Sequence, residues 1–157
     1  MNMLVLCCLF PLSLLAGQQD LEMLLKELDT VIECKDSYIL PKEKELSELR
    51  LRLKNTKNNR QKYELCDKLF TAYLHYQADS ALSYVERKQE LLPFLDESVL
   101  EQELIINRAE VMGVMGMYSW AEQLLSQVKP GILTPELLGY YYRTMRANYG
   151  WFADYLV

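Results

Sequence analysis

Apolar residues between Ser98 and Val128 recur at helical spacing in two short runs, which a turn containing glycine separates. The first run has offsets of 0, 4, 7 and 11, at Ile105, Ala109, Met112 and Gly116. The second has offsets of 0, 3, 4 and 7, at Ala121, Leu124, Leu125 and Val128. Both sets fall on one face of a helix. The pattern predicts a helical hairpin, which cannot bury its apolar face alone and needs neighbours of the same kind.

A related pattern lies about 40 residues earlier. Ala81 and Ala121 each follow an aromatic residue and a short polar stretch, and each precedes an apolar residue four positions later. A spacing of this size is typical of helical repeats. The residues that carry the pattern are Ala81, Ala109, Gly116, Tyr118, Ala121 and Leu125. They resemble the signature of tetratricopeptide (TPR) repeats, which implies an all-α fold of antiparallel helical hairpins, an α-solenoid, over residues 60–157.

Residues 18–55 form a different kind of segment, a long amphipathic, coiled-coil-like helix. Apolar residues recur every seven positions, at Leu25, Ile32, Ile39, Leu46 and Leu53. The companion heptad series is Leu21, Leu28, Lys35, Lys42 and Leu49. Because the heptads keep their register across Pro41, we expect a helix with a kink at this proline. Two interpretations stay open, namely an amphipathic helix packed on the repeats and a coiled coil that forms a homodimer through residues 20–55.

Local signals predict where the later helices begin and end. Ser98 with Glu101, and Ser119 with Glu122, have the spacing of capping boxes. Thr134 before Pro135 is a strong signal for a helix start. Gly150 is predicted to end that helix, and residues 151–157 to begin another. The apolar residues at the end of the chain suggest a truncated array or a missing continuation, because repeat arrays usually end in a polar capping helix.

Residues 1–17 lack charged side chains, and 3–16 are almost wholly apolar. They predict a secretory signal peptide with cleavage near Ala16 or Gly17, hence a periplasmic protein. A buried first helix and an uncleaved anchor are the alternatives. Export would remove Cys7 and Cys8.

Composition and charge narrow the function classes. The 157 residues suffice for one domain, half of them are hydrophobic, and the net charge is −5. This acidic balance argues against binding of nucleic acid by this chain. It leaves protein, peptide and glycan-linked partners open.

Motifs for chemistry are missing from the sequence. His75 is the only histidine, and neither a glycine-rich phosphate loop nor a metal-binding spacing occurs. We therefore expect no enzyme, no cofactor and no metal site. Without the first 17 residues, Cys34 and Cys66 are the two remaining cysteines. They could form a disulfide in an oxidising compartment or remain two free thiols.

A possible binding groove is suggested by the aromatic residues near the end of the chain, namely Tyr140, Tyr141, Tyr142 and Trp151. Such residues could bind a peptide or a sugar. At helical spacing, aromatic residues also commonly belong to a core. The same two interpretations apply to the methionines between 112 and 145, which could form an adaptable surface or fill gaps in a core.

The order of features extends the resemblance beyond a generic repeat. The apolar leader is followed by LLKELDTVI (24–32), KDSYI (35–39), KEKELSEL (42–49), YELCDKLFTAY (63–73) and DSALSYV (79–85). This order resembles the N-terminal periplasmic region of a family of Bacteroidota membrane-bound regulators that carries a domain of unknown function. The resemblance implies the sensing or interaction part of a transcriptional regulator, with a protein or peptide partner. A structural dimerisation module and an intracellular TPR-like adaptor are the alternatives.

Overall fold

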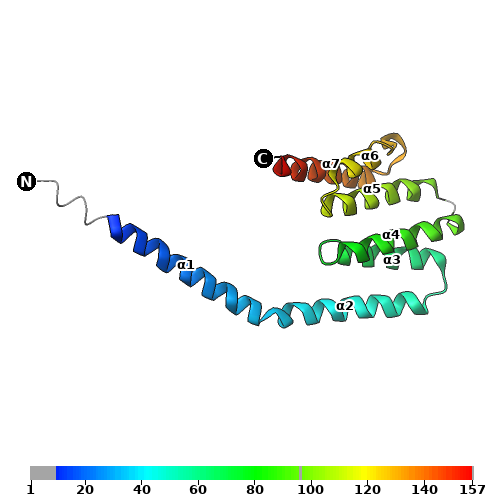
Figure 1. Cartoon of the computed structure of the whole chain (residues 1–157). Coiled ribbons are helices and arrows are strands. Elements are labelled where there is room, and N and C mark those ends of the chain that lie inside the picture. The colour runs from blue at the N-terminus through cyan, green and yellow to red at the C-terminus, as the bar shows by residue number, and fades with distance from the viewer. Residues whose placement is uncertain (1–9, 96, 157) are drawn as a thin grey trace, which may run out of the picture. The chain divides into compact units, whose positions relative to one another are not determined.

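A computed structural model of the chain describes the backbone of residues 10–95 and 97–156 and, within these ranges, the side chains from residue 21 onward (Figure 1). Residues 1–9 of the predicted signal peptide lie outside the described residues. All regular structure in the described ranges is helical. The chain divides into two compact units, residues 1–45 and 46–157. None of the described helices is both long enough and apolar enough to span a membrane.

The first unit contains α1 (Phe10–Glu33) and the start of α2 (Lys35–Asn55). The helix continues through Pro41 as predicted, and the break between α1 and α2 lies earlier, at Cys34. The Cys34 carbonyl accepts hydrogen bonds from the backbone N–H of Ser37 at 3.0 Å and from its hydroxyl at 2.7 Å. These two bonds to Cys34 take the place of the hydrogen bond that the Ser37 N–H would make to the residue four positions earlier in a continuous helix. Pro41 removes one donor from α2, and the helix continues through it.

The heptad pattern of residues 21–53 divides between two roles. Leu46 is fully buried in the core of the second unit, and Leu49 and Leu53 pack against that core. The earlier heptad residues are exposed, namely Leu21, Leu25, Leu28, Ile32 and Ile39. The interpretation of an amphipathic helix packed on the repeats is therefore confirmed for the end of α2.

The second unit is built from helical hairpins, as predicted (Figure 1). Its helices are α3 (Asn59–Tyr73), α4 (Ala78–Leu91), α5 (Ser98–Val114), α6 (Tyr118–Leu125) and α7 (Pro135–Tyr155). Short 3₁₀ turns, η2 (Leu92–Phe94) and η3 (Pro130–Ile132), follow α4 and α6. α3 pairs with α4 and α5 with α6, while α4 packs on α5, and α7 packs on both α5 and α6. This is the TPR-like arrangement.

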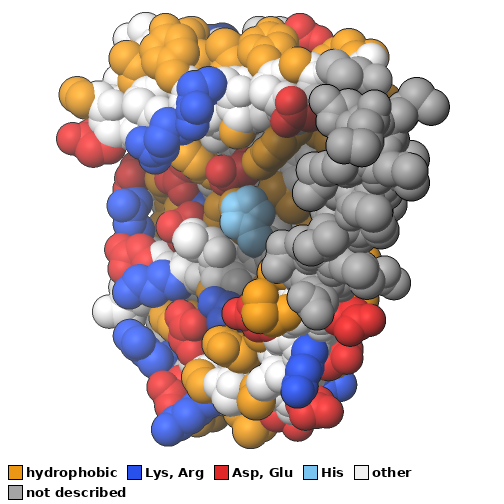
Figure 2. All heavy atoms as spheres, turned by 90° about the vertical axis from the view of Figure 1, so that its left-hand side faces the viewer, with side chains coloured by type: hydrophobic (Ala, Val, Ile, Leu, Met, Phe, Trp, Pro, Cys, Tyr) orange, Lys and Arg blue, Asp and Glu red, His pale blue; other side chains and the backbone are white. Residues whose placement is uncertain are grey.

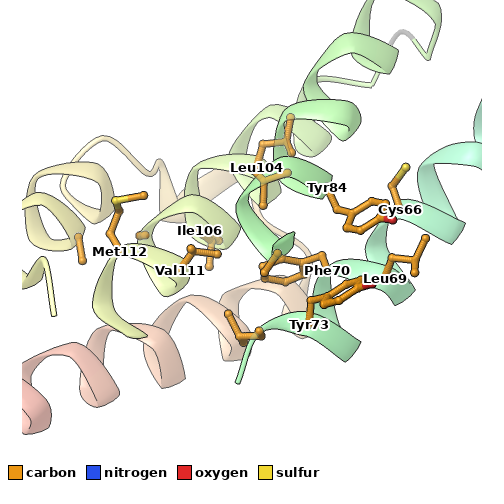
Figure 3. Close-up of a cluster of buried hydrophobic side chains, with 14 of the residues drawn as sticks. Cys66, Leu69, Phe70, Tyr73, Tyr84, Leu104, Ile106, Val111 and Met112 are labelled. Atoms are coloured by element: carbon orange, nitrogen blue, oxygen red, sulfur yellow. The ribbon is translucent and has the colours of Figure 1, made fainter. Parts of the chain in front are cut away.

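The residues of the repeat signature occupy the positions that close helix packing requires. Ala81, Ala109 and Ala121 are fully buried, and Leu125 is nearly so. Gly116 has a φ of 78° in the turn between α5 and α6, a left-handed conformation that favours glycine. Figure 3 shows side chains from α3, α4 and α5 meeting in one apolar cluster. Within it, the rings of Tyr73 and Tyr84 stack with their centroids 5.6 Å apart.

The predicted helix starts are confirmed in part. The hydroxyl of Thr134 accepts a hydrogen bond from the Leu137 N–H, and Pro135 is the first residue of α7. The two predicted capping boxes are wrong. Glu97 and Met117 occupy the N-cap positions of α5 and α6, and neither makes a side-chain capping bond. The sharp turn at Gly116 lets α6 begin by Tyr118, so Ser119 already lies inside that helix.

Gly150 does not end the last helix, in contrast to the prediction, because α7 continues to Tyr155. Packing on α5 and α6 holds the helix together across the glycine. The Asn148 amide donates to the Tyr118 carbonyl at 3.1 Å. Trp151 lies against Gly113 of α5. These contacts outweigh the cost of glycine in a helix interior, about 1 kcal/mol.

Gly113 and Gly150 form a matched pair for testing the close approach of α5 and α7. A Cβ at Gly113 would lie 3.1 Å from the Trp151 ring, whereas a Cβ at Gly150 would meet nothing within 4 Å. We expect Gly113→Ala to lower the free energy of unfolding by about 1–2 kcal/mol through overpacking. Gly150→Ala should raise it by about 0.5 kcal/mol through helix propensity. Urea denaturation of both variants measures the difference, and equal effects would contradict the packing described.

Candidate interaction groove

A groove of about 650 Å³ lies across the first helix of each hairpin and the last helix of the unit. α3 contributes Arg60, Asp67, Phe70 and Thr71, and Leu74 follows at its end. α5 contributes Val99, Leu100, Glu103, Asn107 and Glu110, with Glu97 preceding it. α7 contributes Glu136, Leu137, Tyr140 and Arg143, with Thr134 at its cap. These lining residues include none from α4 or α6.

Helical periodicity explains why these residues share one surface. On α5, Glu103, Asn107 and Glu110 lie at offsets of 0, 4 and 7. On α7, Glu136, Tyr140 and Arg143 have the same offsets. Other residues of these two helices belong to the core, among them Ile106, Val111 and Tyr141. α5 and α7 thus each present a polar stripe to the groove.

Lys88 of α4 lies directly beneath this groove and is fully buried. Its ammonium donates to the Asp67 carboxylate at 2.5 Å, to the Glu103 carboxylate at 2.6 Å and to the Asn107 amide oxygen at 2.7 Å. The ring centroid of Tyr63 lies 4.6 Å from the same nitrogen. All three donor positions of the ammonium are thus satisfied, which a buried charge requires. The contact joins α3 and α4 of the first hairpin to α5 of the second.

The polar network continues from α5 to α7. The Asn107 amide donates to the Tyr140 hydroxyl at 3.0 Å, and that hydroxyl in turn donates to the Glu110 carboxylate. Burial is the largest cause that raises the pKa of Tyr140 and the pKa of Glu110 above their ordinary values. Tyr140 therefore keeps its proton and acts as the donor. The guanidinium of Arg143 lies 5.7 Å from the centre of the Tyr140 ring, at the edge of the groove.

The four predicted groove aromatics do not form one surface. Tyr140 lines the groove, Tyr141 is buried in the core, and the Tyr142 side chain is exposed. Trp151 packs on Gly113. Consecutive helix residues point about 100° apart, so three adjacent tyrosines cannot face the same site. The predicted aromatic groove is wrong in this respect, since only Tyr140 belongs to the groove that the structure has.

A second, smaller pocket of about 400 Å³ gathers other aromatic residues near the end of the unit. The Tyr118 ring lies 5.7 Å from that of Phe152 and 5.9 Å from that of Tyr155, measured between centroids. Trp120 and Met117 complete its exposed apolar lining. In Figure 2, hydrophobic side chains (orange) gather along the top of this face, where α6 and α7 lie.

The remaining predicted residues have simpler environments. Cys34 is exposed and Cys66 is buried, and both are free thiols in the structure. Burial raises the pKa of the Cys66 thiol, which makes it less reactive. His75 is exposed. Of the methionines, Met112 is buried in the core and Met117 is exposed. In the described part of the chain, no three His, Cys, Asp or Glu residues are placed to hold a metal ion.

Lys88 was not predicted from the sequence, although a signal for it existed. Ala81, Val85 and Lys88 lie at offsets of 0, 4 and 7, so the lysine occupies a core position of α4. Asn107 of α5 is likewise a buried polar residue. A lysine and an asparagine at matching core positions of neighbouring helices indicate a buried polar contact.

Stacked antiparallel hairpins with a groove across their first helices define a TPR-type helical-repeat module for protein interaction. The chain matches the family described as the SusR N-terminal TPR domain over residues 32–157 and belongs to that family. This match confirms the predicted resemblance to the TPR-like N-terminal region of a Bacteroidota regulator family. No curated protein and no solved structure matches the chain significantly. TPR domains generally bind other proteins and are generally not enzymes. The family match therefore gives general support for a non-enzymatic module with a protein partner.

The Lys88 contact can be tested by a double-mutant cycle with Lys88→Met, Glu103→Gln and the double variant. We expect Lys88→Met to lower the free energy of unfolding by about 3 kcal/mol, because it leaves two carboxylates without their shared cation. In the Glu103→Gln background the same change should cost about 1 kcal/mol less. Urea denaturation at neutral pH gives all four values. Lys68→Met, at an exposed lysine of α3, is the control and should have an effect within about 0.5 kcal/mol. Equal costs of Lys88→Met in both backgrounds would contradict the contact.

Proposed function

We propose that the chain is the exported, periplasmic sensing part of a membrane-associated transcriptional regulator and that it binds a protein or peptide partner, including a glycan-linked one, without turnover. Family membership supports a role in a regulator. The uncharged, apolar leader of residues 1–17 supports export. In this proposal the chain recognises the partner, and another part of the regulator produces the transcriptional response.

The observation that carries the proposal is the groove across α3, α5 and α7. Its sides carry ordered polar groups, and its apolar contacts include Phe70, Leu74 and Leu137. A surface of this kind provides both hydrophobic contact and hydrogen bonds that fix orientation. The buried Lys88 network places Asp67 and Glu103 before any partner arrives, which lowers the cost of ordering them on binding.

The dimensions of the groove favour an extended segment. Packed helices such as α5 and α7 lie about 8–10 Å apart, and α3 lies farther from α5, so the three helices offer a track of at least roughly 20 Å. An extended chain rises about 3.3 Å per residue, so roughly six residues fit this track. The hydroxyl, amide, carboxylate and guanidinium groups along it can pair with the backbone of such a segment. They can also pair with the hydroxyls of an attached sugar.

The intracellular adaptor is the alternative if the leader is retained. It uses the same groove and differs in compartment and partner. Dimerisation was predicted for other residues, 20–55, and is compatible with a ligand in the groove.

Position-specific photocrosslinking tests the groove. A Cys34→Ser background leaves Cys66, which is buried, as the other described thiol. Glu136→Cys in the groove and Gln123→Cys on α6 are both exposed sites for a benzophenone label. After incubation with a detergent extract of the host envelope and illumination, we expect a discrete adduct from position 136 and none from position 123.

Competition separates specific binding from chance capture. Unlabelled wild-type chain in excess should suppress the adduct. An unlabelled Glu136→Arg/Arg143→Glu variant, which keeps the net charge and alters two exposed groove residues, should not. Equal adducts at both positions, or equal competition by the variant, would rule out the groove as the recognition surface.

A further inference from the structure

Helix α1 carries a continuous apolar stripe on one side. Its six members are Leu21, Leu24, Leu25, Leu28, Val31 and Ile32, and each is 50–59% exposed. At about 100° per residue, these six side chains fall within an arc of roughly 120° around the helix. Tyr38, Ile39 and Leu40, in the first turns of α2, are also exposed. An uncovered apolar stripe of this length is energetically unfavourable in water, because about half of the surface of each large side chain stays hydrated.

The opposite side of α1 is acidic. Glu22, Asp29 and Glu33 lie there with one lysine, Lys26. Helices that lie on membrane surfaces usually carry Lys and Arg on the polar face, which attract anionic lipid headgroups. The charge of α1 has the wrong sign for this role. The stripe therefore fits an apolar protein surface better than a bilayer.

We propose that the stripe on α1 is an interface with a second copy of this chain. A second copy presents the same stripe and so covers it with a surface of equal length and equal apolar character. A half-exposed aliphatic side chain holds roughly 90 Å² of accessible surface. Six from each copy would remove roughly 1,100 Å² from water, which meets the size of about 1,000 Å² that a specific interface needs. The homodimer first considered for residues 20–55 is thereby confined to about 21–32.

The structure explains why the interface stops there. Leu46, Leu49 and Leu53 continue the heptad series but pack in or against the core of the repeat unit. They are not available to a second chain. The dimer contact and the groove thus use separate residues, and the proposal stands whether or not the groove binds a partner.

The test compares two double variants of the chain purified from its own host. Leu25→Asp/Ile32→Asp places two charges within the stripe. Met23→Asp/Thr30→Asp places two charges on the opposite side of the same helix and is the matched control. Light scattering after size-exclusion chromatography gives the mass over a hundredfold range of concentration. We expect twice the mass of one chain for the wild type and the control, and the mass of one chain for the stripe variant.

Circular dichroism and thermal unfolding should show that the repeat unit stays folded in both variants, since α1 contributes nothing to the described core. A wild-type chain that is monomeric throughout the range would overturn the proposal, and the stripe would then cover another surface. A stripe variant that keeps the double mass, or a control that loses it, would equally overturn the assignment to this face.

Discussion

The second unit depends on one buried ammonium group. Lys88 projects from α4 into the space between α3 and α5 and has three oxygen acceptors there. In most helical repeats, neighbouring hairpins are joined by apolar packing, which tolerates small shifts between them. A buried charge is less tolerant, because movement that breaks its contacts leaves the buried ammonium without acceptors. Lys88 therefore restricts how the first hairpin can lie against the second.

The same constraint shapes the groove. Asp67 and Glu103 are partly exposed to the groove, and their carboxylates also form ion pairs with Lys88. The Asn107 amide also donates to the Tyr140 hydroxyl, which extends the network to α7. Five polar lining residues of the three helices are thus joined in one hydrogen-bonded network with Lys88, namely Asp67, Glu103, Asn107, Tyr140 and Glu110. A partner that binds there would meet carboxylate and hydroxyl groups that the interior already holds in place.

Much of the fold could be predicted, because it rests on periodicity and on a few small residues. Ala81, Ala109 and Ala121 mark close helix contacts, and Thr134 with Pro135 marks a helix start that the structure reproduces. The failure at Gly150 has a tertiary cause. Gly150 has a local preference against a helix interior, and the packing of α7 on α5 and α6 keeps the helix intact across it. The site was harder to predict, since a lysine in a charged helix is normally solvated and adjacent tyrosines suggest a cluster that helical geometry separates.

The compartment of the chain decides most directly whether it can be the external sensing part of a regulator. The measurement is the N-terminal sequence and the cellular fraction of the protein produced in its own host. The account predicts a chain that begins near Gly17 or Gln18 and is released with the periplasm. An intact Met1 in the cytoplasm would contradict export and would leave the groove as the binding surface of an intracellular adaptor.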